Sequence, residues 1–123
     1  EGGDAIEGPF DGEEGITLFA DLEAGATGNM SSAMIPDLIK PVVLDYLAGE
    51  IDESEDKYNN ILPVINYENR QCGFRATKVI MKEGGVINSD FCRHPIPPLE
   101  EQTIAGLIKL IKKYDPIALS WGK

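Results

Sequence analysis

Two short polar segments carry side chains that could contact a ligand. Gly12, Glu13 and Glu14 follow one strand-like run, and Ser31 and Ser32 follow a second. Carboxylates accept hydrogen bonds from hydroxyl groups, and a serine hydroxyl can donate one. Each segment also has an ordinary structural interpretation, because acidic residues favour the positive end of a helix and serine favours a helix cap. The residues alone leave both interpretations open.

Other residues capable of chemistry are few. The chain has two cysteines, Cys72 and Cys92, and a single histidine, His94, which is too few for a zinc site. The cysteines could form a redox pair or provide a nucleophile, but reduced and partly buried thiols are expected in a cytosolic protein. We interpret His94, which lies among prolines, as a structural or surface residue. Without a dinucleotide, phosphate-loop or calcium-loop motif, we expect no cofactor and no metal.

The first 32 residues follow the order strand, helix, strand. A strand-like run over 4–10 ends at a Gly8-Pro9 break, a helical pattern stops at Gly25, and a short strand is expected over 26–30. This order predicts one βαβ unit with parallel strands, which needs neighbours on its faces and edges. A closed α/β barrel needs eight strands and about 250 residues. We therefore expect this chain of 123 residues to be the C-terminal part of a larger enzyme.

The remainder is helical by pattern, with apolar residues recurring at intervals of three and four. The expected helices cover 36–48, 52–65, 74–83 and 104–111. The second opens with a capping-box pattern at 52–55 and should kink at Pro63, and a proline-stiffened loop covers 91–98. We predict a mostly helical α/β chain: the last two βα units of a (β/α)8 barrel over 1–50, and a C-terminal helical bundle over 51–123.

Composition narrows the class of protein. The chain is 42% hydrophobic and 26% charged, which is typical of a globular protein. With 21 acidic and 11 basic residues the formal charge is −10, which disfavours nucleic-acid binding. The sequence has no apolar run long enough for a membrane span and does not open like a signal peptide, so a cytoplasmic location is the default. Its start at Glu1 fits a truncated, processed or excised segment.

Four segments together resemble a known family. In order, 23–32, 62–64, 75–87 and 92–99 resemble C-terminal segments of the dihydrodipicolinate synthase and N-acetylneuraminate lyase family, the Schiff-base (class I) aldolases. Residues 66–73 are most similar to the branch that handles 2-keto-3-deoxy sugar acids, such as the 2-keto-3-deoxyarabonate dehydratases. The resemblance covers nearly the whole chain and implies a lyase with the barrel fold.

The resemblance also implies where the chemistry takes place. Family members are expected to form an imine between a lysine on the sixth strand and a pyruvate-like keto acid, while a tyrosine on the fifth strand moves protons. This chain contains neither strand, so we assign it no catalytic residue and expect it to be inactive alone. The full-length parent is expected to be a homo-oligomer, commonly a tetramer.

On this resemblance, Gly12, Glu13 and Glu14 correspond to a family segment that contacts substrate hydroxyls, and Ser31 and Ser32 fall where a pocket serine is kept. Binding groups of such barrels cluster at the C-terminal ends of the strands. Two alternatives stay open: a dihydrodipicolinate synthase, and a self-sufficient helical binding module without catalysis.

Overall fold

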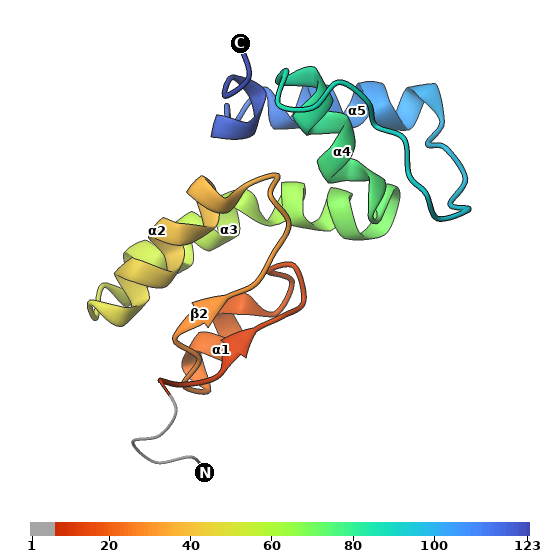
Figure 1. Cartoon of the computed structure of the whole chain (residues 1–123). Coiled ribbons are helices and arrows are strands. Elements are labelled where there is room, and N and C mark those ends of the chain that lie inside the picture. Colours follow the sequence, from red (N-terminus) through yellow and green to blue (C-terminus); the bar gives the residue numbers. More distant parts are fainter. Residues whose placement is uncertain (1–6) are drawn as a thin grey trace. The chain divides into compact units, whose positions relative to one another are not determined.

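The computed structural model describes residues 7–123, which separate into two compact units. The N-terminal unit comprises residues 7–31 and Leu38–Leu62, and the C-terminal unit comprises Ser32–Asp37 and Pro63–Lys123. The chain is mostly helical and contains one two-stranded sheet among the described residues, as Figure 1 shows. The boundary at residue 50 between barrel units and a helical extension stays a prediction.

A small βαβ unit opens the N-terminal unit. Its elements are strand β1 (Phe10–Asp11), helix α1 (Leu18–Glu23) and strand β2 (Gly28–Asn29). The strands are parallel, and Asp11 lies opposite Asn29. The pairing continues past both ends: Thr27 N–H donates to the Pro9 carbonyl at 2.9 Å, and Met30 N–H donates to the Asp11 carbonyl at 2.7 Å. The predicted strand–helix–strand order with parallel strands is confirmed.

The predicted position of the first strand was wrong. It was placed over 4–10 with its end at the Gly8-Pro9 break, whereas β1 begins directly after that break. The part of that run over 4–6 lies outside the described residues. Pro9 cannot donate to a neighbouring strand, but its carbonyl accepts from Thr27, so proline is tolerated where pairing begins. Regular β2 is also shorter than the expected 26–30.

Helices α2 (Pro36–Leu47) and α3 (Ile51–Tyr67) follow, and α3 runs through Pro63. In the N-terminal unit, Phe19 of α1 meets the ring of Tyr46 edge-on at a centroid distance of 5.6 Å and stacks on Tyr58 at 6.0 Å. These aromatic contacts join α1 to both longer helices. Buried apolar side chains complete this core: Leu18, Leu22, Ala26, Ile39, Val42 and Ile61.

The capping-box interpretation of residues 52–55 was also wrong. Helix α3 begins at Ile51, so this tetrapeptide lies inside its first turns. Ser54 is fully buried and donates its hydroxyl to the Val42 carbonyl at 2.7 Å. The serine therefore ties α3 to α2, because a buried hydroxyl must find an acceptor wherever the packing offers one.

The C-terminal unit is built from short helices. Its elements after α3 are a π-helical turn η2 (Glu68–Cys72), α4 (Arg75–Glu83), α5 (Glu101–Ile111) and a 3₁₀ turn η3 (Ile117–Leu119). Helix α4 contacts η2, α5 and η3. As predicted, α4 ends at Gly84, where a Cβ would lie 1.7 Å from the Ala118 carbonyl oxygen, so only glycine fits. The two short turns η2 and η3 were not predicted.

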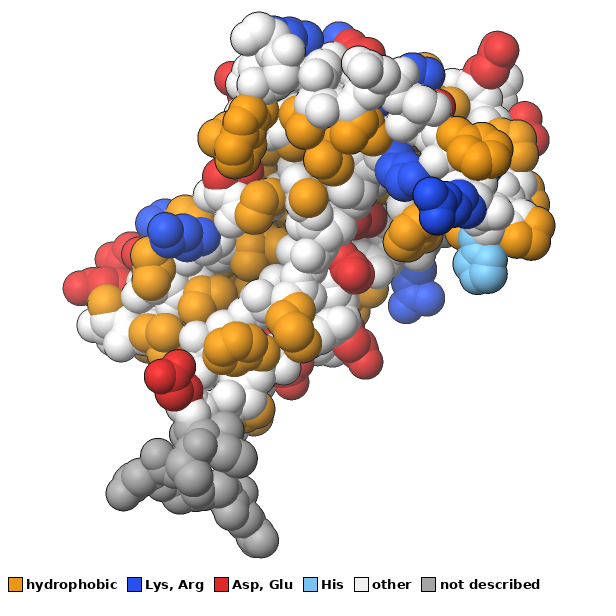
Figure 2. Space-filling model, in the orientation of Figure 1, with side chains coloured by type: hydrophobic (Ala, Val, Ile, Leu, Met, Phe, Trp, Pro, Cys, Tyr) orange, Lys and Arg blue, Asp and Glu red, His pale blue; other side chains and the backbone are white. Residues whose placement is uncertain are grey.

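Both cysteines lie in this unit as buried free thiols, as expected for reduced cysteines. Residues 91–98 contain no helix or strand, which confirms the predicted loop. Among residues 7–123, no helix combines the length and apolar character needed to cross a membrane. Figure 2 shows hydrophobic side chains at the surface, and the most exposed are Phe10, Met30, Phe74, Phe91 and Trp121.

Candidate functional site

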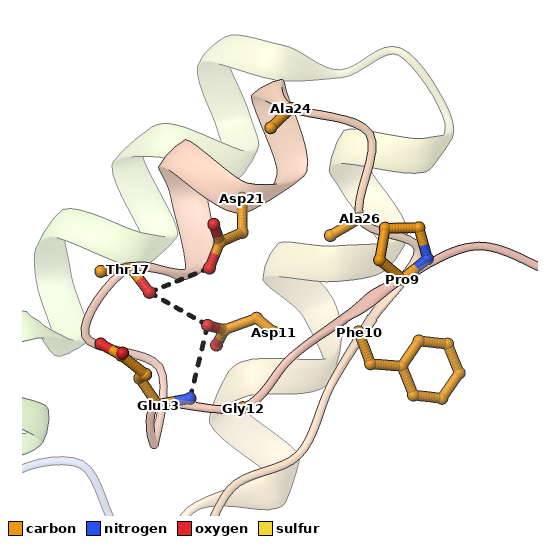
Figure 3. Close-up of a pocket in the computed structure, with 9 residues that line it drawn as sticks. All are labelled: Pro9, Phe10, Asp11, Gly12, Glu13, Thr17, Asp21, Ala24 and Ala26. Carbon is orange, nitrogen blue, oxygen red and sulfur yellow. Dashed lines mark hydrogen bonds between the residues drawn. The ribbon is translucent and has the colours of Figure 1, made fainter. Parts of the chain in front are cut away.

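A pocket of about 450 Å³ opens beside β1 and α1 in the N-terminal unit. This volume suits a small molecule. Figure 3 shows the lining residues: Pro9, Phe10, Asp11, Gly12, Glu13, Thr17, Asp21, Ala24 and Ala26. The polar part of the lining consists of Asp11, Glu13, Thr17 and Asp21, and the apolar part consists of Pro9, Phe10, Ala24 and Ala26.

Asp11 is the centre of the polar part. Successive side chains of a strand point to opposite faces, and here Phe10 is 53% exposed whereas Asp11 is only 2% exposed. The Asp11 carboxylate accepts hydrogen bonds from the Asn29 side-chain amide and from the Thr17 hydroxyl, at 3.1 Å for Thr17. A longer contact of 3.5 Å joins it to the Glu13 N–H. One carboxylate thus connects the ends of both strands with the loop and the helix between them.

Thr17 links two carboxyl groups. Its Oγ1 lies 3.1 Å from Asp11 Oδ1 and 2.9 Å from Asp21 Oδ2 (Figure 3). A hydroxyl carries one proton and can also accept one hydrogen bond. Thr17 can therefore donate to only one of the two carboxyl groups at a time.

The burial of Asp11 and the nearby Asp21 shift the pKa of the Asp11 carboxyl group. Burial raises the pKa of Asp11 above its ordinary value of 3.8, and the hydrogen-bonded neighbour Asp21 raises it further, while the Thr17 hydroxyl acts in the opposite direction. Desolvation disfavours a charged carboxylate, and a second acidic group nearby has the same effect. Asp11 therefore retains its proton to a higher pH than an ordinary aspartic acid does.

The structure brings together only some of the predicted site residues. Gly12 and Glu13 line the pocket, and the Glu13 side chain is exposed. Glu14 is half-buried and has a positive φ of 56°. Ser31 is half-buried in the N-terminal unit. Ser32 belongs to the C-terminal unit, where its Oγ accepts from the Met34 N–H at 3.3 Å. Contact of these five residues with a substrate stays a prediction.

Sequence reasoning missed four polar residues that build the site: Asp11, Thr17, Asp21 and Asn29. Two signals could have found them. Asn29 is a polar residue in an otherwise small and apolar strand, and Thr17 stands four residues before Asp21, the spacing at which helical side chains meet.

No lysine lies on either strand of the described residues. The eight lysines occupy helices, turns or the chain end: Lys40, Lys57, Lys78, Lys82, Lys109, Lys112, Lys113 and Lys123. This placement of the lysines on helices, turns and the chain end is the one that we expected.

The comparisons with known proteins define the class. A model of the dihydrodipicolinate synthetase family matches residues 9–114, and the chain belongs to this family. It is 50% identical over 120 residues to L-2-keto-3-deoxyarabonate dehydratase of Azospirillum brasilense, covering 98% of this chain and 39% of that protein. The structure matches dihydrodipicolinate synthase from Rhodopseudomonas palustris with a TM-score of 0.78 at 26% identity, covering 89% of this chain and 38% of that one. The chain thus spans about two fifths of the length of these relatives.

Proposed function

We propose that this chain is the C-terminal part of a Schiff-base-forming keto-acid lyase, with 2-keto-3-deoxy sugar acids as substrates. The observation that carries the proposal is the 50% identity to L-2-keto-3-deoxyarabonate dehydratase across 98% of the chain. The parallel strand pair supports it, because β1 and β2 with α1 form a βαβ unit of the kind repeated in a (β/α)8 barrel. In this proposal the two strands are the last of such a barrel.

The pocket supports a hydroxylated substrate. A 2-keto-3-deoxy sugar acid carries hydroxyl groups beyond its keto-acid end, and each hydroxyl can donate a hydrogen bond to a carboxylate. Glu13 and the buried Asp11 supply such acceptors beside the pocket. Gly12, Glu13, Glu14, Ser31 and Ser32 are proposed to contact the distal part of the substrate.

The keto-acid end needs a group that this chain does not supply. The imine lysine and the proton-moving tyrosine are proposed to come from other strands of the longer protein, so the chain alone is inactive. The parent is proposed to be a cytoplasmic homo-oligomer that needs no metal or other cofactor.

The test is imine trapping in the longer protein. Incubation with pyruvate or with 2-keto-3-deoxyarabonate, followed by borohydride reduction, should add the mass of the bound keto acid less one oxygen atom to the intact protein, because imine formation releases water and reduction adds two hydrogens. The 123-residue chain treated in the same way is the matched control and should show no adduct. A longer protein that forms no adduct with either compound would remove the assignment.

A second candidate activity is that of the structural relative, a dihydrodipicolinate synthase. Its 26% identity makes it the weaker candidate beside the 50% identity of the dehydratase. Turnover of 2-keto-3-deoxyarabonate, compared with turnover of pyruvate plus aspartate semialdehyde, separates the two activities.

A further inference from the structure

A tyrosine outside the βαβ unit holds the loop that carries the acidic residues of the pocket. This loop, residues 12–16, connects β1 to the start of α1. Tyr58 of α3 is only 7% exposed, and its hydroxyl lies within hydrogen-bonding distance of the carbonyls of Gly15, at 2.8 Å, and Ile16. The two contacts join positions more than forty residues apart in the sequence.

The loop needs such an anchor because its backbone is unusual. Glu14 and Gly15 both have positive φ, 56° and 87°. For glutamate this conformation is strained, and such strain persists only where surrounding contacts impose it. Inside the loop, Ile16 N–H donates to the Glu13 carbonyl at 3.0 Å. The Tyr58 hydroxyl carries one proton, so it donates to the Gly15 or the Ile16 carbonyl at any one time, and either hydrogen bond ties the end of the loop to α3.

The position of Tyr58 is itself fixed. Its ring stacks on Phe19 of α1 at a centroid distance of 6.0 Å. Burial raises the pKa of the Tyr58 hydroxyl above its ordinary value of 10.0, and the negative charges of Asp11 and Asp21 raise it further. The hydroxyl therefore keeps its proton and remains a donor throughout the physiological pH range.

We propose that Tyr58 is a positioning residue that holds the 12–16 loop so that Glu13 and Glu14 can recognise the distal hydroxyls of the substrate. This inference rests on the proposed function and assigns a specificity role to a helix that contributes no residue to the lining of the pocket. Substrates that lack distal hydroxyls, such as pyruvate, make no use of this recognition.

The test uses Tyr58→Phe in the longer protein, with Tyr46→Phe as the matched control. Both variants keep a ring against Phe19, but only Tyr58 reaches the loop carbonyls. Tyr58→Phe should lower kcat/KM for 2-keto-3-deoxyarabonate by about five- to thirtyfold, mostly through KM, because one hydrogen bond that fixes the loop is lost. Borohydride trapping with pyruvate should be unchanged, and Tyr46→Phe should behave as the wild type in both assays.

Two results would overturn the inference. Unchanged kinetics with the sugar acid would show that the hydroxyl does not position the loop for recognition. A loss of kcat/KM with the sugar acid that is matched by an equal loss of pyruvate trapping would show a general structural defect. By contrast, absence of any pyruvate adduct in the wild-type longer protein counts against the proposed function.

A measurement on the 123-residue chain decides the positioning role whatever the reaction is. The amides of Ile16 and Leu18 are hydrogen-bonded to carbonyls of the loop, at 3.0 Å and 3.3 Å. Their hydrogen exchange should be faster in Tyr58→Phe than in Tyr46→Phe or the wild type. Equal exchange in all three proteins would overturn the positioning role directly.

Discussion

Asp11 and Asn29 are register partners in the sheet, and a hydrogen bond also links their side chains. They lie opposite one another in the parallel strand pair, and the Asn29 side-chain amide donates to the buried Asp11 carboxylate. The strand pair is short, since each strand has only two residues. This side-chain contact therefore supplies part of the cohesion that longer strands would obtain from backbone hydrogen bonds.

Replacing Asp11 with alanine should destabilise the chain by about 1–3 kcal/mol, because Asn29 and Thr17 would lose a shared buried acceptor. Urea unfolding followed by circular dichroism measures the change. Glu23→Ala, an exposed acidic residue on α1, is the control and should stay within about 0.5 kcal/mol of the wild type. Equal midpoints for the two variants would contradict the role given to Asp11.

The raised pKa of Asp11 predicts a definite pH dependence. The folded protein binds this proton more tightly than the unfolded chain, so the stabilising contribution is present below pH 3.8 and is lost as the pH rises through the raised pKa. Asp11→Asn removes this titration. Its free energy of unfolding relative to the wild type should therefore improve as the pH rises from about 3 to about 7.

Asp90 provides a control of opposite sign for this pH experiment. The hydrogen bond from Lys82 holds its pKa below the ordinary value, so its contribution is present at higher pH and is lost as the pH falls. Relative to the wild type, Asp90→Asn should lose stability as the pH rises over the same range. Parallel pH profiles for the Asp11 and Asp90 variants would refute the assignment.

The elements predicted correctly are helices in which apolar residues recur over several turns or in which a proline or glycine marks a boundary. Helix α2 begins at Pro36, and α4 ends at Gly84, because proline and glycine restrict the backbone locally. The contact of Ser54 with Val42 and that of Tyr58 with the 12–16 loop depend on which helices meet, which a local pattern does not contain. The Asp11–Thr17–Asp21 arrangement was missed for the same reason. Glu13 was singled out because its segment resembles one of the family.

A steric conflict between Gly106 and Tyr67 allows a double-mutant test in the C-terminal unit. A Cβ on Gly106 would lie 2.2 Å from the Tyr67 hydroxyl oxygen, which is held by its hydrogen bond to the Thr103 carbonyl at 3.1 Å. Alanine normally stabilises a helix interior by about 1 kcal/mol relative to glycine. Gly106→Ala should nevertheless destabilise the chain, and in a Tyr67→Phe background the same change should become neutral or stabilising.

The coupling between these two changes should be about 0.5–3 kcal/mol, measured from the four urea unfolding curves of the cycle. Additive effects of the two substitutions would show that the tyrosine side chain moves away freely.

Cys72 should resist alkylation in the folded chain. Burial, reinforced by the negative charge of Glu68, raises the pKa of the thiol to about 11, so roughly one molecule in ten thousand carries a thiolate at pH 7. In a Cys92→Ser background, iodoacetamide should label the native protein far more slowly than the urea-unfolded protein, and the native rate should still be rising above pH 9. Equal labelling rates in the native and unfolded proteins would disprove the burial of this thiol.

The sheet of the described residues stops at two strands. Its outer edges offer main-chain donors and acceptors to any extended segment that reaches them, and such edges act as templates for further strands. In the proposed barrel another strand would lie beside this pair, so a peptide copied from the corresponding strand of a relative should add to one edge and improve the solubility of the chain. Without such a peptide, copies of the chain should pair through these edges. Precipitation should therefore increase with the concentration of the chain.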